Sequence, residues 1–233
     1  MADYILNIES STGVCSVSIS SGNDIVSFRE SKTDRSHASM LTVFIEEVMK
    51  ESGIGTKGLA AVAVSSGPGS YTGLRIGTSA AKGICYAADL PLIAVNTLAL
   101  MTQMVLESPD IQPGEDSLLC PMIDARRMEV YTALFDASGK QTTDISAEII
   151  TGNTFRHLLD ERKILFCGDG AEKCMETIDH KNAVFVPGIY PSAVMMAAFA
   201  SSALKEGRIE NTAYFTPFYL KDFLTTIPKR KMF

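Results

Sequence analysis

Alternating and continuous runs of hydrophobic residues divide the first half of the chain into short elements. Three runs at residues 4–10, 14–20 and 24–30 are separated by tight turns, which predicts an antiparallel meander of three strands. Residues 36–52 then show the spacing of an amphipathic helix, and residues 59–66 form a continuous apolar run of the kind found in buried parallel strands. A helix, a strand and another helix follow, so the expected order is β-β-β-α-β-α-β-α.

The second half of the chain repeats this order after a linker. The linker at residues 108–117 is rich in Pro, Gly, Ser and acidic residues. Beyond it, the strand that ends at Asp124 matches in pattern the strand that ends at Glu9. A second strand is expected at residues 128–136, helices are expected at 154–161 and 171–178, and strands and helices alternate toward the C-terminus. We therefore predict an α/β protein of two tandem lobes, residues 1–107 and 108–233, with the duplicated unit of the actin and sugar-kinase fold class.

Charge and composition narrow the range of partners. The 233 residues carry a formal net charge of −6, and the pI is about 5.1. No basic stripe is large enough to hold nucleic acid alone, and no apolar run is long enough to cross a membrane. The cysteines are odd in number and form no CxxC pair, and an acidic residue stands near the N-terminus. These features favour a reduced, cytoplasmic protein without a signal peptide.

The most distinctive stretch, residues 65–83, has the sequence SSGPGSYTGLRIGTSAAKG. It lacks the Lys-Ser/Thr pair of a P-loop, yet Gly67 and Gly69 could direct backbone N–H groups toward an anion at the start of a helix. A second glycine turn, residues 168–170, also follows a strand. It is either part of a nucleotide site or a tight turn in which Asp169 caps the next helix. A candidate cofactor-binding site would combine Glu9, Gly67, Gly69, Gly168, Asp169 and Gly170.

The helix after the first glycine turn carries a face of small residues. From Tyr71 onward, small and apolar residues recur at steps of three and four: Gly73, Gly77, Ala80, Ala81 and Ile84. Each glycine inside a helix lowers helix stability by about 1 kcal/mol relative to alanine. The glycines on this face therefore indicate a groove into which another part of the protein, or another protein, packs closely. The groove either packs against the protein's own sheet or receives a partner, and the sequence leaves both interpretations open.

Catalytic and metal-binding patterns are not found in the sequence. There is no HExxH zinc motif and no GxSxG nucleophile elbow. The helix at residues 36–52 offers His37, but Leu41 stands four residues later, so this helix holds no second imidazole for a metal ion. We therefore predict no catalytic residue, no metal site and no cofactor.

Six stretches of the chain form recognisable motifs: ILNIESST (5–12), DRSHASML (34–41), GPGSYTGLRIGTSAAKG (67–83), IDARRMEVY (123–131), FCGDG (166–170) and PFYLKDF (217–223). They resemble the motifs of the TsaB (YeaZ) family of bacterial tRNA threonylcarbamoyladenosine biosynthesis proteins. The resemblance covers nearly the whole chain, with one departure: the family usually has Asp where this chain has Glu9. The related transferase, TsaD, holds a metal ion through two histidines four residues apart, a pair that His37 and Leu41 do not reproduce.

The resemblance implies a pseudoenzyme that acts as a scaffold. It would pair with TsaD, work with the ATPase TsaE, and meet tRNA only through the complex that forms N6-threonylcarbamoyladenosine in ANN-decoding tRNAs. A homodimer is expected for the isolated protein, and the basic residues 229–231 are expected to be solvated. The expected interface residues are His37, Leu41, Phe44, Tyr71, Gly73, Gly77, Ala80, Ala81 and Ile84. The alternatives are an ATP-binding phosphotransferase or ATPase of the same fold class, and a glycoprotease-type peptidase.

Overall fold

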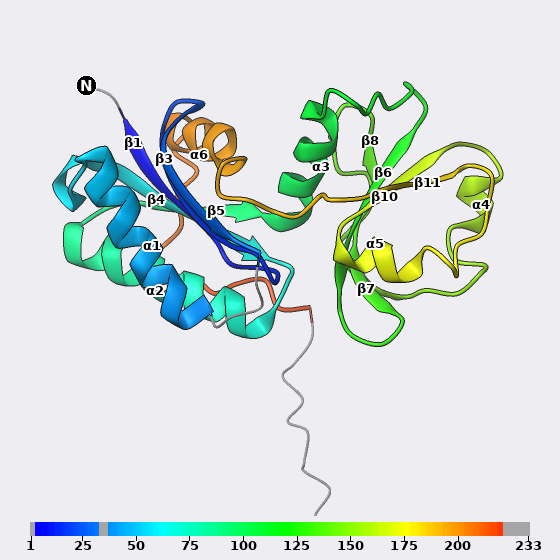
Figure 1. The fold of residues 1–233 in the computed structure, drawn as a ribbon, viewed down its shortest axis with the longest axis horizontal. Coiled ribbons are helices and arrows are strands. Elements are labelled where there is room, and N and C mark those ends of the chain that lie inside the picture. The colour runs from blue at the N-terminus through cyan, green and yellow to red at the C-terminus, as the bar shows by residue number, and fades with distance from the viewer. Residues whose placement is uncertain (1–2, 33–36, 221–233) are drawn as a thin grey trace, which may run out of the picture.

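The computed structural model of the protein describes residues 3–32 and 37–220 (Figure 1). The first half forms a five-stranded sheet in the order β3-β2-β1-β4-β5. Its first three strands pair antiparallel through tight turns, while β4 and β5 run parallel to β1 because helices connect them. The strands are β1 (Tyr4–Glu9), β2 (Cys15–Ser21), β3 (Asp24–Ser31), β4 (Leu59–Gly67) and β5 (Leu92–Asn96).

The helices of the first half are α1 (His37–Ser52), η1 (Thr56–Gly58), α2 (Tyr71–Ala88) and α3 (Thr97–Glu107). Polar side chains fix two of their starts. Ser70 Oγ accepts a hydrogen bond from the Gly73 N–H at 3.2 Å, and Asn96 Oδ1 accepts one from the Ala99 N–H at 2.9 Å. Residue 36, where the sequence places the start of α1, lies outside the described residues. The expected order of elements in the first half is confirmed.

The second half builds a sheet of the same topology. Its strands lie in the order β11-β10-β6-β7-β9, and β8 pairs with β6. Followed from the β9 edge, this order matches that of the first sheet, so the predicted repeat of two actin and sugar-kinase-like units is confirmed. The strands are β6 (Leu118–Asp124), β7 (Glu129–Thr132), β8 (Phe135–Asp136), β9 (Ser146–Ile149), β10 (Ile164–Cys167) and β11 (Ala183–Val186). The helices are α4 (Arg156–Leu159), α5 (Asp169–Cys174) and α6 (Met196–Lys205).

Several elements of the second half are shorter than the sequence predicts. The helix expected at 154–161 is α4, with four residues, and the helix expected at 171–178 is α5, with six. Neither helix begins with a side chain that accepts a hydrogen bond from its first turn. A helix without such a cap is less stable at its N-terminus, so each helix is shorter than its apolar run predicts. The single strand expected at 128–136 is divided into β7 and β8.

Two helices cover the sheet of the opposite half (Figure 1). Helix α3 packs Leu98 and Met101 against Leu119 of β6, and helix α6 packs Met196 and Ala200 against Ile93 of β5. The sequence repeat assigned α6 to the second lobe, and this assignment is wrong. An apolar sheet face must be covered by a helix, and any helix within reach can cover it. The order of elements along the chain does not determine which helix does so. The expected boundary at residues 107 and 108 therefore separates the two sheets but not the helices that cover them.

The core is divided among four buried clusters, with one cluster on each face of each sheet. All five cysteines lie in this buried interior and none is bonded to another. Burial raises the pKa of Cys120 to about 12, so this thiol stays protonated at neutral pH. Within residues 3–32 and 37–220, no helix combines the length and the apolar character that a membrane crossing requires.

Candidate functional site

The glycine turn between β4 and α2 is filled by the protein's own backbone. The Ser70 N–H donates to the Ser11 carbonyl at 2.6 Å, and Ser10 Oγ donates to the Gly73 carbonyl at 2.9 Å. A Cβ atom added at Gly69 would overlap the Ser11 carbonyl oxygen, and one added at Gly73 would overlap that of Ser10. Glycine is therefore needed here so that the turn after β1 can approach α2 closely. The carbonyl oxygens of Ser11 and Ser10, which repel an anion, lie against Gly69 and Gly73.

A C-terminal strap, residues Asn211–Tyr219, covers the other side of this turn. The Phe218 N–H donates to the Ser66 carbonyl at 2.7 Å, and the Tyr219 ring lies 4.9 Å from the ring of Tyr71. Gly67 has a φ of +101°, and a Cβ atom on it would lie 2.9 Å from the Phe218 carbonyl oxygen. Figure 1 shows the strap, coloured orange to red, passing beside the start of α2. Sequence reasoning missed this contact because its two sides are far apart along the chain.

Glu9 lies at the end of β1, completely buried beneath the glycine turn. Its Oε1 accepts hydrogen bonds from the Ser11 N–H at 2.6 Å and from Ser11 Oγ at 2.5 Å, while its Oε2 has no partner. Burial raises the pKa of Glu9 to about 7, against a lowering effect of the Ser11 hydrogen bonds. The carboxyl faces the interior of the protein, so it braces the turn that carries Ser11 and does not line an open site.

The second glycine turn is also packed internally. A Cβ atom on Gly168 would overlap the Met122 carbonyl oxygen, and Gly170 lies against the same stretch of β6. The sequence offers Asp169 as a cap for the following helix. Its Oδ1 instead accepts from the Asp124 N–H of β6 at 2.9 Å, and no side chain caps α5. Burial raises the pKa of Asp169. This turn therefore ties β10 to β6, and the cap interpretation is wrong.

A charged pair beside this turn was missed by the sequence analysis. Lys173 of α5 forms an ion pair with Asp124 and donates a hydrogen bond to the Glu129 carbonyl at 2.6 Å. Asp124 also accepts from the backbone N–H of Arg126 at 2.7 Å. No local pattern in the sequence pointed to this pair, because Asp124 and Glu129 lie 49 and 44 residues before Lys173.

The structure divides the predicted interface residues into buried and half-buried sets. Leu41, Gly73, Gly77 and Ala81 are buried within the chain and cannot meet a partner in this conformation. Gly77 packs against Ile8 of β1 and against Ser10 in the turn after β1, which resolves the groove in favour of internal packing. Phe44, Tyr71, Ala80 and Ile84 are half-buried and keep part of their surface. The side chain of His37 lies outside the described residues.

Gly83, which was not among the predicted interface residues, lies on the exposed side of α2. Gly83 is exposed, and a Cβ atom added there would meet nothing within 4 Å. It continues the Ala80 ridge one turn along the helix, and Ala87 extends it further. On the adjacent α1, Val43 is 47% exposed. We call this the α1–α2 outer face, defined by Val43, Phe44, Ala80, Gly83, Ile84 and Ala87.

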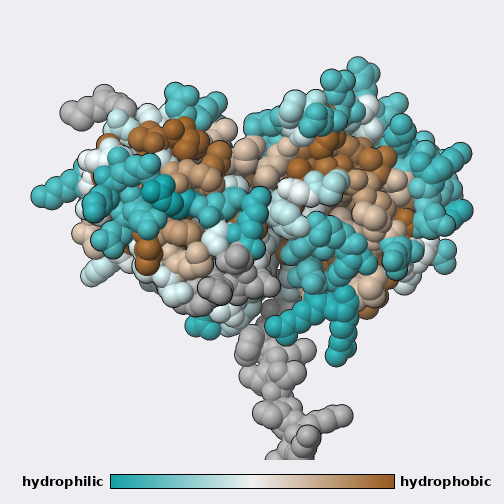
Figure 2. Space-filling model, viewed as in Figure 1, coloured by the Kyte–Doolittle hydropathy of each residue, from teal (hydrophilic) through white to brown (hydrophobic). Residues whose placement is uncertain are grey.

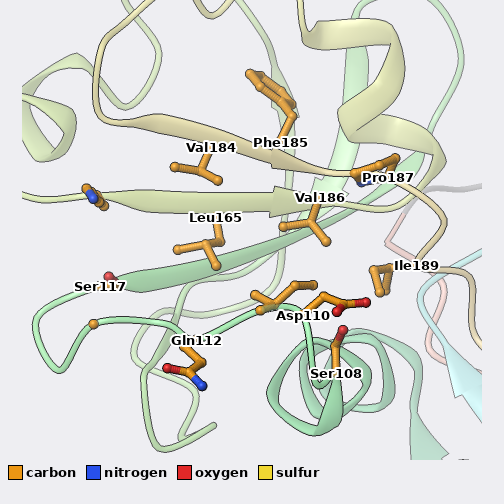
Figure 3. Close-up of a pocket in the computed structure, with 13 residues that line it drawn as sticks. Ser108, Asp110, Gln112, Ser117, Leu165, Val184, Phe185, Val186, Pro187 and Ile189 are labelled. Atoms are coloured by element: carbon orange, nitrogen blue, oxygen red, sulfur yellow. The ribbon is translucent and has the colours of Figure 1, made fainter.

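Two cavities lie away from the glycine turns. The larger, about 700 Å³, lies between the linker and strands β10 and β11, with Leu165, Val184 and Val186 on its floor and Asp110 at its edge (Figure 3). The smaller, about 270 Å³, lies between the lobes beside Glu30 and Tyr190. Figure 2 shows the notch that separates the lobes, with hydrophobic residues gathered on both sides of it. Neither cavity contains the glycines that the sequence analysis selected.

Comparison with known proteins identifies the family. The family model described as "TsaD: tRNA N6-adenosine threonylcarbamoyltransferase" matches residues 30–228. The curated Escherichia coli protein "tRNA threonylcarbamoyladenosine biosynthesis protein TsaB" is 27% identical over 226 residues, which cover 94% of each chain. The chain belongs to the TsaB/YeaZ branch of the TsaD family. The resemblance seen in the sequence motifs is confirmed.

Further relatives agree with a TsaB/YeaZ assignment. The Haemophilus influenzae protein of the same name is 34% identical over 127 residues, so the match spans about half of that relative, 51% of its length. The solved structure "YeaZ from Pseudomonas aeruginosa" superposes with a TM-score of 0.79 at 21% identity and covers 94% of this chain and 100% of that one. At this identity the superposition shows the shared fold.

Proposed function

We propose that this TsaB/YeaZ chain is a non-catalytic scaffold subunit. It acts with a TsaD transferase and the ATPase TsaE to form N6-threonylcarbamoyladenosine in tRNAs that read ANN codons. The names of the curated TsaB relatives support the pathway, and the match to the TsaD family model supports a place beside a TsaD transferase within it. The protein works in the cytoplasm, where the tRNA that the complex modifies is found.

The observation that carries the scaffold proposal is the filled glycine turn. A nucleotide site at this place needs backbone N–H groups that point at a phosphate. Here the Ser70 N–H donates to the Ser11 carbonyl, and the Phe218 carbonyl lies over Gly67. The acidic residue at the turn, Glu9, is directed into the core. A bound nucleotide would therefore have to displace two segments of the protein itself.

The α1–α2 outer face supports the assembly part of the proposal. Its centre is the ridge of half-buried Ala80 and exposed Gly83 and Ala87, over which another helix can approach without a large side chain between the backbones. Val43 adds exposed apolar surface beside the ridge. A hydrophobic face of this kind favours a protein partner, and in the absence of TsaD the same face is available for a homodimer.

The proposal is tested by separating binding from activity. Isothermal titration with Mg-ATP should give no heat of binding to the chain alone, whereas tRNA modification by TsaD and TsaE should depend on adding the chain. An active ATP-binding enzyme of the same fold would instead bind Mg-ATP at micromolar concentration and release ADP. Turnover by the isolated chain, or full modification without it, would overturn the scaffold assignment. A peptidase would cleave a glycoprotein substrate.

The variant Glu9→Gln sharpens this test. It keeps the shape of the side chain and removes the acidic group at the turn. A scaffold tolerates this change, so the reconstituted complex should modify tRNA at the wild-type rate. An enzyme that used Glu9 to hold a metal-nucleotide would lose about a hundredfold in rate, as happens when a metal ligand or the group that orients it is removed.

A further inference from the structure

The helices of the described residues leave part of the second sheet uncovered. The larger cavity lies on this part, with Leu165 of β10 and Val184 and Val186 of β11 directed into it (Figure 3). Val184 is 38% exposed, although it is an apolar residue inside a strand. The volume of about 700 Å³ is within the range of sites that hold a ligand. We call this surface the β10–β11 trough, defined by Asp110, Lys163, Leu165, Val184, Val186 and Ile189.

The equivalent surface of the first sheet is covered by a helix. Strand β5 takes the place in the first sheet that β11 takes in the second, at the same end of the strand order. Its residues Ile93 and Val95 are 1% and 3% exposed, because they pack in one cluster with Met196 of α6. Helix α3, which covers the second sheet as α6 covers the first, packs on β6 and leaves Val184 outside its cluster. The second sheet therefore lacks, at this position, the helical cover that the first sheet has.

Two charged residues stand at opposite ends of the trough. Asp110 lies beside Ile189, at the end where β11 finishes (Figure 3), and Lys163 directly precedes β10, at the end where the strands begin. Both are exposed, and neither forms an ion pair with another described residue. A helix has partial positive charge at its N-terminus and partial negative charge at its C-terminus. The two residues therefore favour a bound helix whose N-terminus lies at Asp110 and whose C-terminus lies at Lys163.

The direction of the strands favours the same orientation. Strands β10 and β11 are parallel. A helix that connects parallel strands of a sheet returns the chain to the starting end, so it runs antiparallel to the strands on which it packs. On the trough, such a helix begins at the Asp110 end and finishes at the Lys163 end. Charge and sheet geometry thus agree on the kind of element and on its direction.

We infer that the β10–β11 trough binds an amphipathic helix of a partner protein. The apolar residues of that helix recur at steps of three and four, as Met196, Ala200 and Ala203 of α6 do on the first sheet. They pack on Val184 and fill the space beside it. The trough belongs to the second sheet and the α1–α2 outer face to the helices of the first, so the inference does not rest on the proposed scaffold role.

The variant Val184→Cys tests whether the trough is free in the full chain. All five native cysteines are buried, so the new thiol is the reactive one. It should react with a maleimide at a rate comparable with that of Val26→Cys, a matched position because Val26 is 43% exposed on the edge strand β3. Much slower labelling at every protein concentration would mean that residues 221–233, which lie outside the described residues, cover the trough. Labelling that slows as the protein concentration rises would mean that a second copy does. Either result would overturn the inference.

Phage display on the full chain tests the helical partner. Random peptides of about 15 residues, enough for four helical turns, are selected on the wild type and counter-selected on Val184→Asp. Selected peptides should carry apolar residues at steps of three and four and become helical on binding, as circular dichroism measures. A bound peptide should slow the labelling of Val184→Cys and leave that of Val26→Cys unchanged.

Fluorescence anisotropy of a selected peptide measures what each residue contributes. Val184→Asp should weaken binding about tenfold or more, because it places a charge against the apolar face of the peptide. The matched Val26→Asp should bind as the wild type does. Asp110→Asn and Lys163→Gln should each weaken binding about two- to fivefold, the size expected for a charge at a helix end. Lys57→Gln removes an exposed lysine elsewhere and should have no effect.

The orientation of the peptide provides an independent check. A nitroxide at its N-terminus should broaden the NMR signals of Asp110 and Ile189, and one at its C-terminus should broaden those of Lys163. The reverse orientation, selected peptides with alternating apolar residues, or binding that Val184→Asp leaves unchanged would overturn the inference. Thermal melts establish that Val184→Asp is folded. Val184→Thr, which keeps the shape of the side chain, should also weaken binding and replaces it if it is not.

Discussion

Ser10 lies directly against Gly77, so the turn after β1 and the middle of α2 touch at the level of the backbone. The Ser10 hydroxyl fills the space that a side chain at 77 would occupy, and it donates to the Gly73 carbonyl at 2.9 Å. One serine thereby contacts two successive turns of the helix. This contact explains why the glycines of the family motif occur inside a helix, where glycine by itself is unfavourable.

Gly77→Leu should destabilise the protein by about 3 kcal/mol, because the new side chain has no space beside Ser10 and Ile8. Urea unfolding followed by circular dichroism measures the loss. Gly77→Ala should already destabilise, since its single Cβ atom overlaps the Ser10 hydroxyl. A wild-type midpoint for Gly77→Leu would mean that α2 does not lie on β1 as described.

Gly83→Leu is the matched control on the same helix and a test of the α1–α2 outer face. Space around Gly83 is open, so this variant should fold and gain up to about 1 kcal/mol from helix propensity. If the ridge receives TsaD, the leucine should weaken the heterodimer at least tenfold in a titration, and the homodimer should shift toward monomer in analytical ultracentrifugation. Unchanged association of both kinds would place the partner elsewhere.

The contrast between Gly77 and Gly83 marks the limit of sequence reasoning at the site. Both glycines lie on α2, and helical spacing correctly grouped Gly73, Gly77 and Ala81 on one face. Periodicity cannot tell whether a smooth face meets the protein's own sheet or a neighbour, because both require small residues. That decision depends on Ser10, which is distant in sequence and carries no pattern of its own.

The fold was predictable to the extent that local patterns determine it. Turns and apolar runs predicted the meander β1–β3 and the parallel β4, and the same patterns revealed the repeat. Long-range choices were not predictable. Helix α6 packs on the first sheet and the strap returns to α2, because these contacts depend on which uncovered surface the C-terminal chain can reach. The short α4 and α5 lack capping side chains, so their bounds were overestimated.

Glu9 should make stability fall as the pH rises through the neutral range. Its pKa is about 7 in the folded protein, raised by burial from 4.5, so the folded state binds the proton more tightly than the unfolded chain does. The buried carboxyl therefore leaves the free energy of unfolding unchanged below about pH 4.5. As the pH rises, it lowers this free energy by a growing amount, which reaches about 3 kcal/mol above pH 7. Urea unfolding near pH 5 and near pH 8 measures this difference.

Glu9→Gln isolates the contribution of this carboxyl from other titrating groups. The variant cannot ionise, so the stability difference between it and the wild type should shift in favour of the variant by about 2.5 kcal/mol between the two pH values. Glu46→Gln, at an exposed position of α1, provides the control and should show no such shift. A constant difference between Glu9→Gln and the wild type would show that Glu9 is not buried beneath the turn.

Lys82→Met should loosen the strap without unfolding the protein. The ammonium group donates to the carbonyls of Ala213 and Phe215, and its loss leaves the strap with the Phe218–Ser66 hydrogen bond and its aromatic contacts. Loss of two charge-assisted bonds at a partly exposed site should raise the open population about tenfold. Chymotrypsin, which cleaves after aromatic residues, should then cut within residues 214–219 about tenfold faster, as mass spectrometry of the fragments can establish. Lys57→Met removes an exposed lysine of η1 and should leave the rate unchanged; equal rates for Lys82→Met and wild type would mean that Lys82 does not hold the strap.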